Sequence, residues 1–495
     1  MHRLAISNFA LAAAVALMFP GLARGDDLSQ ERCRLAADQL PAAFARCGVL
    51  KVPENPAVPD GAQVELFVAR VAALTSAPKP DPLLLIAGGP GQSTVDFYLQ
   101  MRAAFEAVRR ERDLILVDQR GTGRSSAGFT CNVPDDLALD TAGPEQLGSF
   151  IDSCVAGLEH DPRFYTTTVA VADLEEVRAA LGIAQWNLYG ISYGTRVAQH
   201  YLRRFPEHAR AVVLDGVVPP ALALGPDVAR EAQRALDEIF ARCRADDGCG
   251  KHFADLPAEF ATLLARLEAA PVGNATGAGA LPAEPAAAQA PPGRTTFGAQ
   301  ELRALVRFMS YSSTTVALLP VLLHEAYNGN YDPLVSQAST LLRGLPESLS
   351  FAMSNSVVCT EDMPFVAAGA GDGLADTYLG TSIVDSLSLI CSRWPAGEID
   401  ADFKTPVQSD LPVLLLSGSN DPITPPDYAQ LVAATLPNSA QLVGQGQGHG
   451  LLPVGCVPRI IAKFIDDPNP QSVAADCLAA EPPTPFFLTL LGPAP

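Results

Sequence analysis

The fold of this chain is decided by residues 186–196, which read WNLYGISYGTR. The largely apolar run at its start predicts a strand, and a helical pattern follows at once from Thr195 to Arg204. The Gly-x-Ser-x-Gly motif between them puts Ser192 on a sharp turn, where a base can reach its hydroxyl proton. Gly190 and Gly194 have no Cβ, which lets the strand and the helix cross closely. A chance match is the alternative, but the strand before and the helix after favour a nucleophile elbow.

The first 25 residues predict a secretory signal peptide. A basic start at His2-Arg3 precedes an apolar run from Leu4 to Phe19, and residues 23–25 form a small-residue cleavage site. A membrane anchor is the alternative, but Ser7-Asn8 leaves the run shorter than the roughly 18 apolar residues of a span. We therefore expect a mature chain from about Asp26, secreted or periplasmic and without a membrane span.

Composition places the chain among large globular proteins. It has 495 residues, of which 48% are hydrophobic and 18% charged, enough for a large α/β domain with a substantial insertion. The formal net charge of −20 argues against nucleic acid or an anionic membrane as a partner. Oligomeric state is left open by the sequence.

The ten cysteines agree with export to an oxidising compartment. They fall into couples that are close in sequence, and we expect each couple to form a disulfide. The predicted pairs are Cys33 with Cys47, Cys131 with Cys154, Cys243 with Cys249, Cys359 with Cys391, and Cys456 with Cys477. No Cys-x-x-Cys occurs and His252 has no partner at ligand spacing, so neither zinc nor another metal or cofactor is expected.

Strand and helix patterns alternate along most of the chain. Strands are expected at 63–74, 82–87, 112–118, 186–191, 211–216, 411–417 and 439–443, and a helix at 170–181. This order predicts an α/β fold with a mostly parallel, doubly wound sheet. Helical segments over 217–403 predict a cap inserted before the last strands, with a loop rich in Pro, Ala and Gly at 269–293. The two parts of the core are then 26–216 and 404–495.

Two glycine-rich loops follow predicted strands. A phosphate-binding loop at Gly88-Gly89-Pro90-Gly91 is the alternative to an oxyanion hole, but the P-loop lysine is missing. We therefore expect a backbone N–H of Gly88 or Gly89 to form the oxyanion hole with the N–H of Tyr193. The loop at 118–125 predicts a rigid wall held by Asp118 with Arg120 or Arg124, the alternative being a solvated turn.

A serine nucleophile needs a base and an orienting acid. Of the seven histidines, only His449 stands in a glycine-flanked loop after a strand, which predicts the general base. Asp421 follows the preceding strand and is the expected acid. The order Ser192, Asp421, His449 is that of an α/β hydrolase.

Several runs carry a more specific resemblance. The runs GGPG at 88–91, DQRGTGRS at 118–125 and GISYGT at 190–195 resemble the prolyl aminopeptidase and tripeptidyl aminopeptidase branch of the α/β hydrolases. The runs DGVVPP at 215–220, DPITP at 421–425 and GHG at 448–450 resemble its secreted, tripeptidyl-aminopeptidase-like group. The resemblance implies a serine exopeptidase acting on peptides with a free N-terminus. The family often has His before GGPG, whereas this chain has Ala87, which puts the substrate range in doubt.

An aminopeptidase must also hold the substrate's ammonium group, and a desolvated carboxylate is a suitable partner. Glu361 and Asp362 lie next to Cys359 in the predicted cap, so we expect Glu361, with Asp362 second, to bind the amine. A solvated acidic turn is the alternative. The sequence thus predicts an exported serine exopeptidase that works through an acyl-enzyme. An ester hydrolase of the same fold and a non-catalytic binding protein are the other hypotheses.

Overall fold

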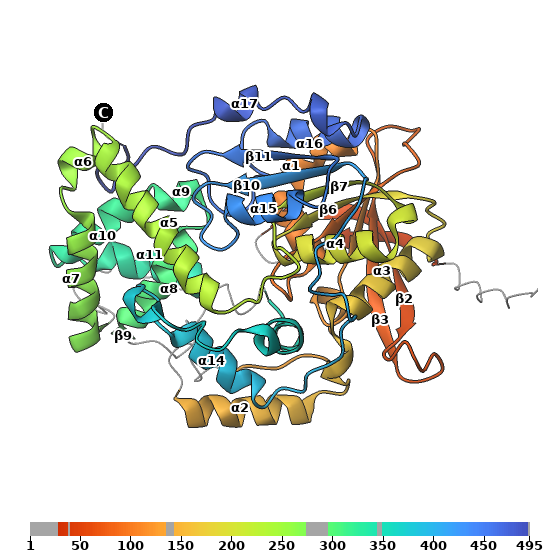
Figure 1. Cartoon of the computed structure of the whole chain (residues 1–495), viewed down its shortest axis with the longest axis horizontal. Helices are drawn as coiled ribbons and strands as arrows, with labels where there is room; N and C mark the ends of the chain where they lie inside the picture. The colour runs from red at the N-terminus through yellow and green to blue at the C-terminus, as the bar shows by residue number, and fades with distance from the viewer. Residues whose placement is uncertain (1–27, 38–39, 135–142, 274–295, 344–348, 494–495) are drawn as a thin grey trace, which may run out of the picture.

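A mostly parallel sheet forms the centre of the molecule (Figure 1). The structure is a computed structural model that describes residues 28–37, 40–134, 143–273, 296–343 and 349–493. In these residues a nine-stranded sheet has the order β1-β2-β3-β5-β4-β6-β7-β10-β11. Its strands are β1 (Glu31–Leu35), β2 (Ala43–Pro53), β3 (Gln63–Val71), β4 (Leu83–Ile86), β5 (Leu114–Val117), β6 (Trp186–Ile191), β7 (Ala209–Asp215), β10 (Val413–Gly418) and β11 (Ser439–Gly444). Neighbours from β5 to β11 pair in parallel, as predicted, and those from β1 to β5 antiparallel.

The sequence does not predict the first two strands. Both lie at one side of the sheet, where β1 pairs only with β2. Apolar residues of β2 face solvent there, with Phe44 82% and Val49 51% exposed. The alternation that marks a half-buried strand is therefore weak in this segment.

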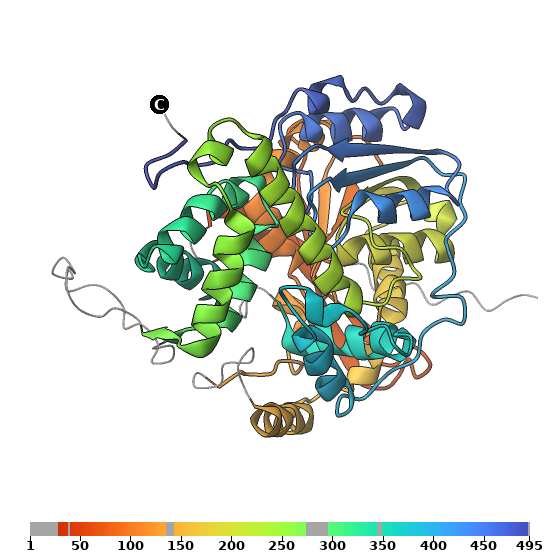
Figure 2. The same ribbon diagram turned by 60° about the vertical axis from the view of Figure 1, so that its left-hand side comes forward.

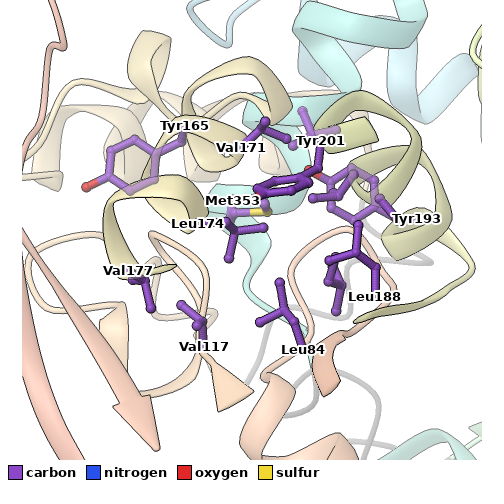
Figure 3. Close-up of a cluster of buried hydrophobic side chains, with 14 of the residues drawn as sticks. Leu84, Val117, Tyr165, Val171, Leu174, Val177, Leu188, Tyr193, Tyr201 and Met353 are labelled. Atoms are coloured by element: carbon purple, nitrogen blue, oxygen red, sulfur yellow. The ribbon is translucent and has the colours of Figure 1, made fainter. Parts of the chain in front are cut away.

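Helices cover both faces of the sheet. One face packs against α1 (Thr94–Arg109) and α16 (Val457–Asp466), and the other against α3 (Thr167–Ala180), α4 (Tyr193–Arg204) and α15 (Pro426–Ala433). Successive residues of β4 point to opposite cores, since Leu84 lies in one hydrophobic cluster and Leu85 in the other. Figure 3 shows the first of these cores, with Leu84 and Leu188 of the sheet below the side chains of α3 and α4. Burial on both faces explains why these strands are continuous apolar runs.

The chain between β7 and β10 is largely helical. Its helices are α5 (Pro226–Ala245), α6 (Cys249–His252), α7 (Leu256–Ala269), α8 (Ala299–Met309), α9 (Ser313–Val316), α10 (Leu319–Tyr327), α11 (Asp332–Arg343), α13 (Phe351–Val357) and α14 (Ser382–Cys391). The helices from α5 to α11 share a hydrophobic core of their own and lie to one side of the sheet (Figures 1 and 2). By contrast, Met353 of α13 packs into the core of the sheet (Figure 3). The region that the sequence predicts as one cap therefore packs in two ways, and its boundaries stay a prediction.

Shorter elements complete the described chain. They are α2 (Pro144–Gly157), α17 (Asp476–Ala479), the strand pair β8 (Val272–Gly273) and β9 (Thr296–Phe297), the π-helix η4 (Val358–Asp362), and the 3₁₀ turns η1 (Gly123–Ser125), η2 (Pro162–Phe164), η3 (Pro206–His208), η5 (Met363–Phe365), η6 (Leu374–Asp376) and η7 (Pro470–Ser472). The ten cysteines form the five predicted disulfides. No helix of the described segments is long and apolar enough to cross a bilayer. The predicted signal peptide and most of the predicted 269–293 loop lie outside the described residues.

Candidate active site

Ser192 stands on a strained turn between β6 and α4. Its φ is 55° and its ψ −125°, and within the described chain it is the only non-glycine residue with positive φ. Such a conformation costs about 1–3 kcal/mol and persists only where the surroundings enforce it. A Cβ on Gly190 would collide with the carbonyl of Gly194, and one on Gly194 with the carbonyl of Ile86. The turn therefore has the geometry of the predicted elbow.

Asp421 and His449 meet at the same edge of the sheet. Asp421 follows β10 and His449 follows β11, and these two parallel strands are neighbours. His449 Nδ1 lies 2.8 Å from Asp421 Oδ2, as expected for an N–H donor on a carboxylate. The carboxylate also accepts the backbone N–H groups of Ile423 (2.9 Å) and Thr424 (2.8 Å) and the Thr424 hydroxyl (2.7 Å). Four donors thus hold Asp421 in one orientation.

These contacts set the tautomer and the basicity of His449. With Nδ1–H directed at Asp421, the lone pair of Nε2 can accept a proton. Burial lowers the pKa of the imidazole, but the charge and hydrogen bond of Asp421, aided by the charge of Asp215, outweigh burial and the charge of Arg307. The net result is a pKa above the ordinary histidine value, which suits a general base.

The end of β7 lies between the serine and the histidine. Ser192 N–H donates to the Asp215 carbonyl at 2.9 Å, and a Cβ on Gly216 would lie 3.0 Å from His449 Cε1. No hydrogen bond joins Ser192 to His449 in the described part of the chain. Catalytic hydrogen bonds are often long in ligand-free enzymes and tighten when substrate binds.

Asp215 is a site residue that the sequence analysis did not single out. Its buried carboxylate accepts the backbone N–H of Leu451 (2.7 Å) and of Leu452 (2.9 Å) and the Tyr189 hydroxyl (2.8 Å). Through these bonds it holds the loop that carries His449, while its own carbonyl holds Ser192. The sequence signals are its place near the end of a predicted strand and its place in the DGVVPP run at 215–220, and neither indicates these partners.

The glycine loop after β4 approaches the nucleophile. A Cβ on Gly88 would lie 3.0 Å from Ser192 Cβ, so only glycine permits this approach. The Gly88 N–H donates to Gln92 Oε1 at 3.2 Å and is therefore occupied. Of the two predicted glycine donors, Gly89 is the one left for an oxyanion, together with Tyr193 at the first position of α4.

Asp118 and Arg120, which the sequence predicts to hold the loop at 118–125 as a wall of the site, are buried. Arg120 has no exposed surface and forms a bidentate ion pair with Asp173, with both N–O distances 2.7 Å. Asp118 accepts the backbone N–H of Val95 at 3.0 Å and of Arg124 at 2.9 Å, which ties the loop to α1. The solvated-turn alternative is therefore wrong for Asp118 and Arg120.

Glu361 and Asp362 are buried beneath the nucleophile helix. Glu361 accepts the N–H and the hydroxyl of Thr167 at 2.6 and 2.8 Å, and Asp362 accepts a bond from Arg196 of α4 at 2.8 Å. Burial raises the pKa of Glu361 to about 7, although the charge of Arg196 opposes this. Both side chains are at most 2% exposed, so neither carboxylate is open to a substrate in this structure. The amine anchor stays a prediction, and the solvated-turn alternative is wrong.

The described residues contain no group of three or more His, Cys, Asp or Glu side chains that could hold a metal ion. A cavity of about 630 Å³ lies between α16 and α17, and its lining includes none of the three triad residues.

Comparisons with known proteins identify the family of the chain. A family model described as alpha/beta hydrolase fold matches residues 81–455. Serine protease Hip1 of Mycobacterium tuberculosis is 31% identical over 273 residues, which are 49% of this chain and 52% of that protein. Tripeptidyl aminopeptidase of Streptomyces lividans is 30% identical over 193 residues, 36% of each chain. Carboxylesterase B of Mycobacterium tuberculosis is 32% identical over 246 residues, 45% of this chain and 46% of that protein.

The chain thus spans about half the length of the curated relatives it matches, or less. Among solved structures, the proline iminopeptidase of Mycobacterium smegmatis is 18% identical, with a TM-score of 0.39 over 85% of this chain and 98% of that chain.

Proposed function

Because the chain belongs to the α/β hydrolase family, we propose that it is a serine hydrolase whose nucleophile, base and orienting acid are Ser192, His449 and Asp421. The observation that carries the proposal is the strained turn at Ser192 next to the hydrogen-bonded pair of His449 and Asp421. Each of the three residues follows the carboxyl end of a parallel strand, where parallel α/β sheets carry their active sites, and this supports the proposal.

The mechanism follows from the roles of these groups. Ser192 Oγ attacks the scissile carbonyl while His449 Nε2 takes its proton, and Asp421 stabilises the imidazolium that forms. The N–H groups of Tyr193 and Gly89 would stabilise the oxyanion. His449 then gives the proton to the leaving group. Water next attacks the acyl-enzyme while His449 Nε2 takes a proton from it, and that proton passes to Ser192 Oγ as the acyl ester bond breaks.

We propose peptides with a free N-terminus as substrates. The resemblance of the GGPG and GISYGT runs supports this, as does the similarity to a tripeptidyl aminopeptidase. The similarity to a carboxylesterase supports ester hydrolysis as the second candidate. Five disulfides support an exported protein, because such bonds persist in oxidising compartments.

The test compares tripeptidyl and aminoacyl arylamides that have free or blocked amino groups with the matched esters. We expect each arylamide with a free amino group to be cleaved faster than its blocked counterpart, and Ser192→Ala to abolish both hydrolysis and labelling by a fluorophosphonate. Cleavage of the esters without cleavage of any arylamide, or equal rates on free and blocked substrates, would favour the esterase. A wild-type protein that neither reacts with the fluorophosphonate nor cleaves any substrate would favour a binding protein.

A further inference from the structure

A cluster of hydrogen-bond donors from the helical region borders His449, and the proposed mechanism does not use it. Tyr311 follows α8, and its carbonyl accepts the backbone N–H of His449 at 2.9 Å. The two rings meet edge to face, with centroids 5.1 Å apart. Arg307, one turn earlier on α8, donates from Nη2 to the Tyr311 hydroxyl at 3.4 Å. The guanidinium is thus linked to the imidazole through a single side chain.

Among the described residues, no acid forms an ion pair with Arg307. Arg303, one turn earlier on α8, pairs with Glu268, whereas Arg307 forms no ion pair with any described residue. The contrast is informative because the chain has 54 acidic and only 34 basic residues. A guanidinium without an acidic partner can donate to an anionic group of a ligand.

We propose that Arg307, with the hydroxyl group of Tyr311, forms a subsite that binds a carboxylate of the substrate's leaving half. The fork of a guanidinium matches a carboxylate in shape and charge. We assign the subsite to the part of the peptide after the scissile bond, because His449 gives its proton to the leaving amine and Tyr311 packs against His449. This inference rests on the proposed peptidase function and adds a substrate preference to it.

The carboxylate can be the C-terminus of a short peptide or an acidic side chain just after the scissile bond. Three peptides separate these sources: tetra-alanine with a free carboxylate, the same peptide as a carboxamide, and a carboxamide with aspartate as the first residue of the leaving half. If the subsite binds the C-terminus, we expect the wild type to have a kcat/KM about tenfold higher for the free-carboxylate peptide than for its carboxamide. If it binds an acidic side chain, the aspartate carboxamide should exceed the plain carboxamide by the same factor, as charge-assisted hydrogen bonds allow. Arg307→Gln should lose this preference, and Arg307→Lys should keep part of it. Because the charge of Arg307 also lowers the pKa of His449, the preference is taken as the ratio of kcat/KM values for two peptides measured on the same variant.

Arg266→Gln is the matched control. Arg266 is an exposed cation on α7 that donates to the Tyr327 carbonyl, so its replacement changes the net charge equally without touching the cluster. We expect this variant to keep the preference. Wild-type protein that cleaves the arylamide yet treats all three peptides alike would overturn the subsite and leave the proposed function intact.

A binding measurement makes the subsite testable even without turnover. In the Ser192→Ala background, calorimetry should show the carboxylate peptide binding about tenfold tighter than its carboxamide, and adding Arg307→Gln should remove the difference. Equal affinities in the Ser192→Ala protein would overturn the proposal. If the wild-type protein cleaved no substrate while the Ser192→Ala protein kept this difference in affinity, the proposed function would be refuted and the subsite would stand.

Discussion

Asp215→Asn tests whether the end of β7 positions His449, the proposed general base. The carboxylate accepts two backbone N–H groups, from Leu451 at 2.7 Å and from Leu452 at 2.9 Å, and the Tyr189 hydroxyl at 2.8 Å. An asparagine has one acceptor oxygen, so at least one buried N–H would face the amide NH₂. A buried unsatisfied donor costs about 1–3 kcal/mol, and we expect the free energy of unfolding to fall by about 2 kcal/mol.

Two kinetic effects should accompany this loss. The loop that carries His449 would shift, and a displacement of about 1 Å can lower kcat by roughly a hundredfold. The charge of Asp215 also raises the pKa of His449, so its removal should move the low-pH limb of the kcat/KM profile to lower pH. The measurements are denaturant unfolding and a pH–rate profile on a neutral arylamide.

Asp113→Asn is the matched control. Asp113 is also buried and accepts a backbone N–H, that of Ala73 at 2.7 Å, but it precedes β5 at the opposite edge of the sheet. We expect this variant to lose stability while its pH profile stays that of the wild type. An Asp215→Asn protein with wild-type kcat and pH profile would refute the positioning role.

Three further changes probe the site. Asp421→Asn should lower kcat by about 10³–10⁴-fold and move the low-pH limb downward, because the carboxylate raises the pKa of His449; an unmoved limb in a pH–rate profile would contradict this. Gln92→Ala removes the acceptor that holds the Gly88 N–H and so loosens the loop that carries Gly89; it should lower kcat about tenfold at nearly constant KM in steady-state assays, and an unchanged kcat would contradict this role. Glu361 has a folded-state pKa of about 7, above its unfolded value, so its contribution to stability is complete below about pH 4 and is lost as the pH rises to 7. In the wild type, the free energy of unfolding should therefore fall by about 3 kcal/mol between those limits because of Glu361, and Glu361→Gln should remove this fall. Urea unfolding at several pH values measures it, and a variant with the pH dependence of the wild type would contradict the raised pKa.

The sequence alone determined the features that depend on local patterns. The elbow at Ser192 could be predicted because the glycines, the strand and the helix are adjacent in sequence. Asp421 and His449 could be selected as candidates because each follows a strand. The disulfide partners are close in sequence, so their pairing could be predicted from spacing. Burial of the central strands on both faces made them continuous apolar runs.

Tertiary structure decided what depends on contacts between distant residues. Asp215 reaches Leu451 across 236 positions and Glu361 reaches Thr167 across 194, and neither partner leaves a mark in the local sequence. For the same reason the acidic pair at Glu361 and Asp362 could not be recognised as buried. In the sequence, nothing distinguishes Arg307 from the other arginines of predicted helices. Only the fold places it near His449, through Tyr311, with no ion pair to a described acidic residue. A side chain's partners depend on how the chain packs, whereas local sequence patterns record mainly which element a segment forms and which of its faces is buried.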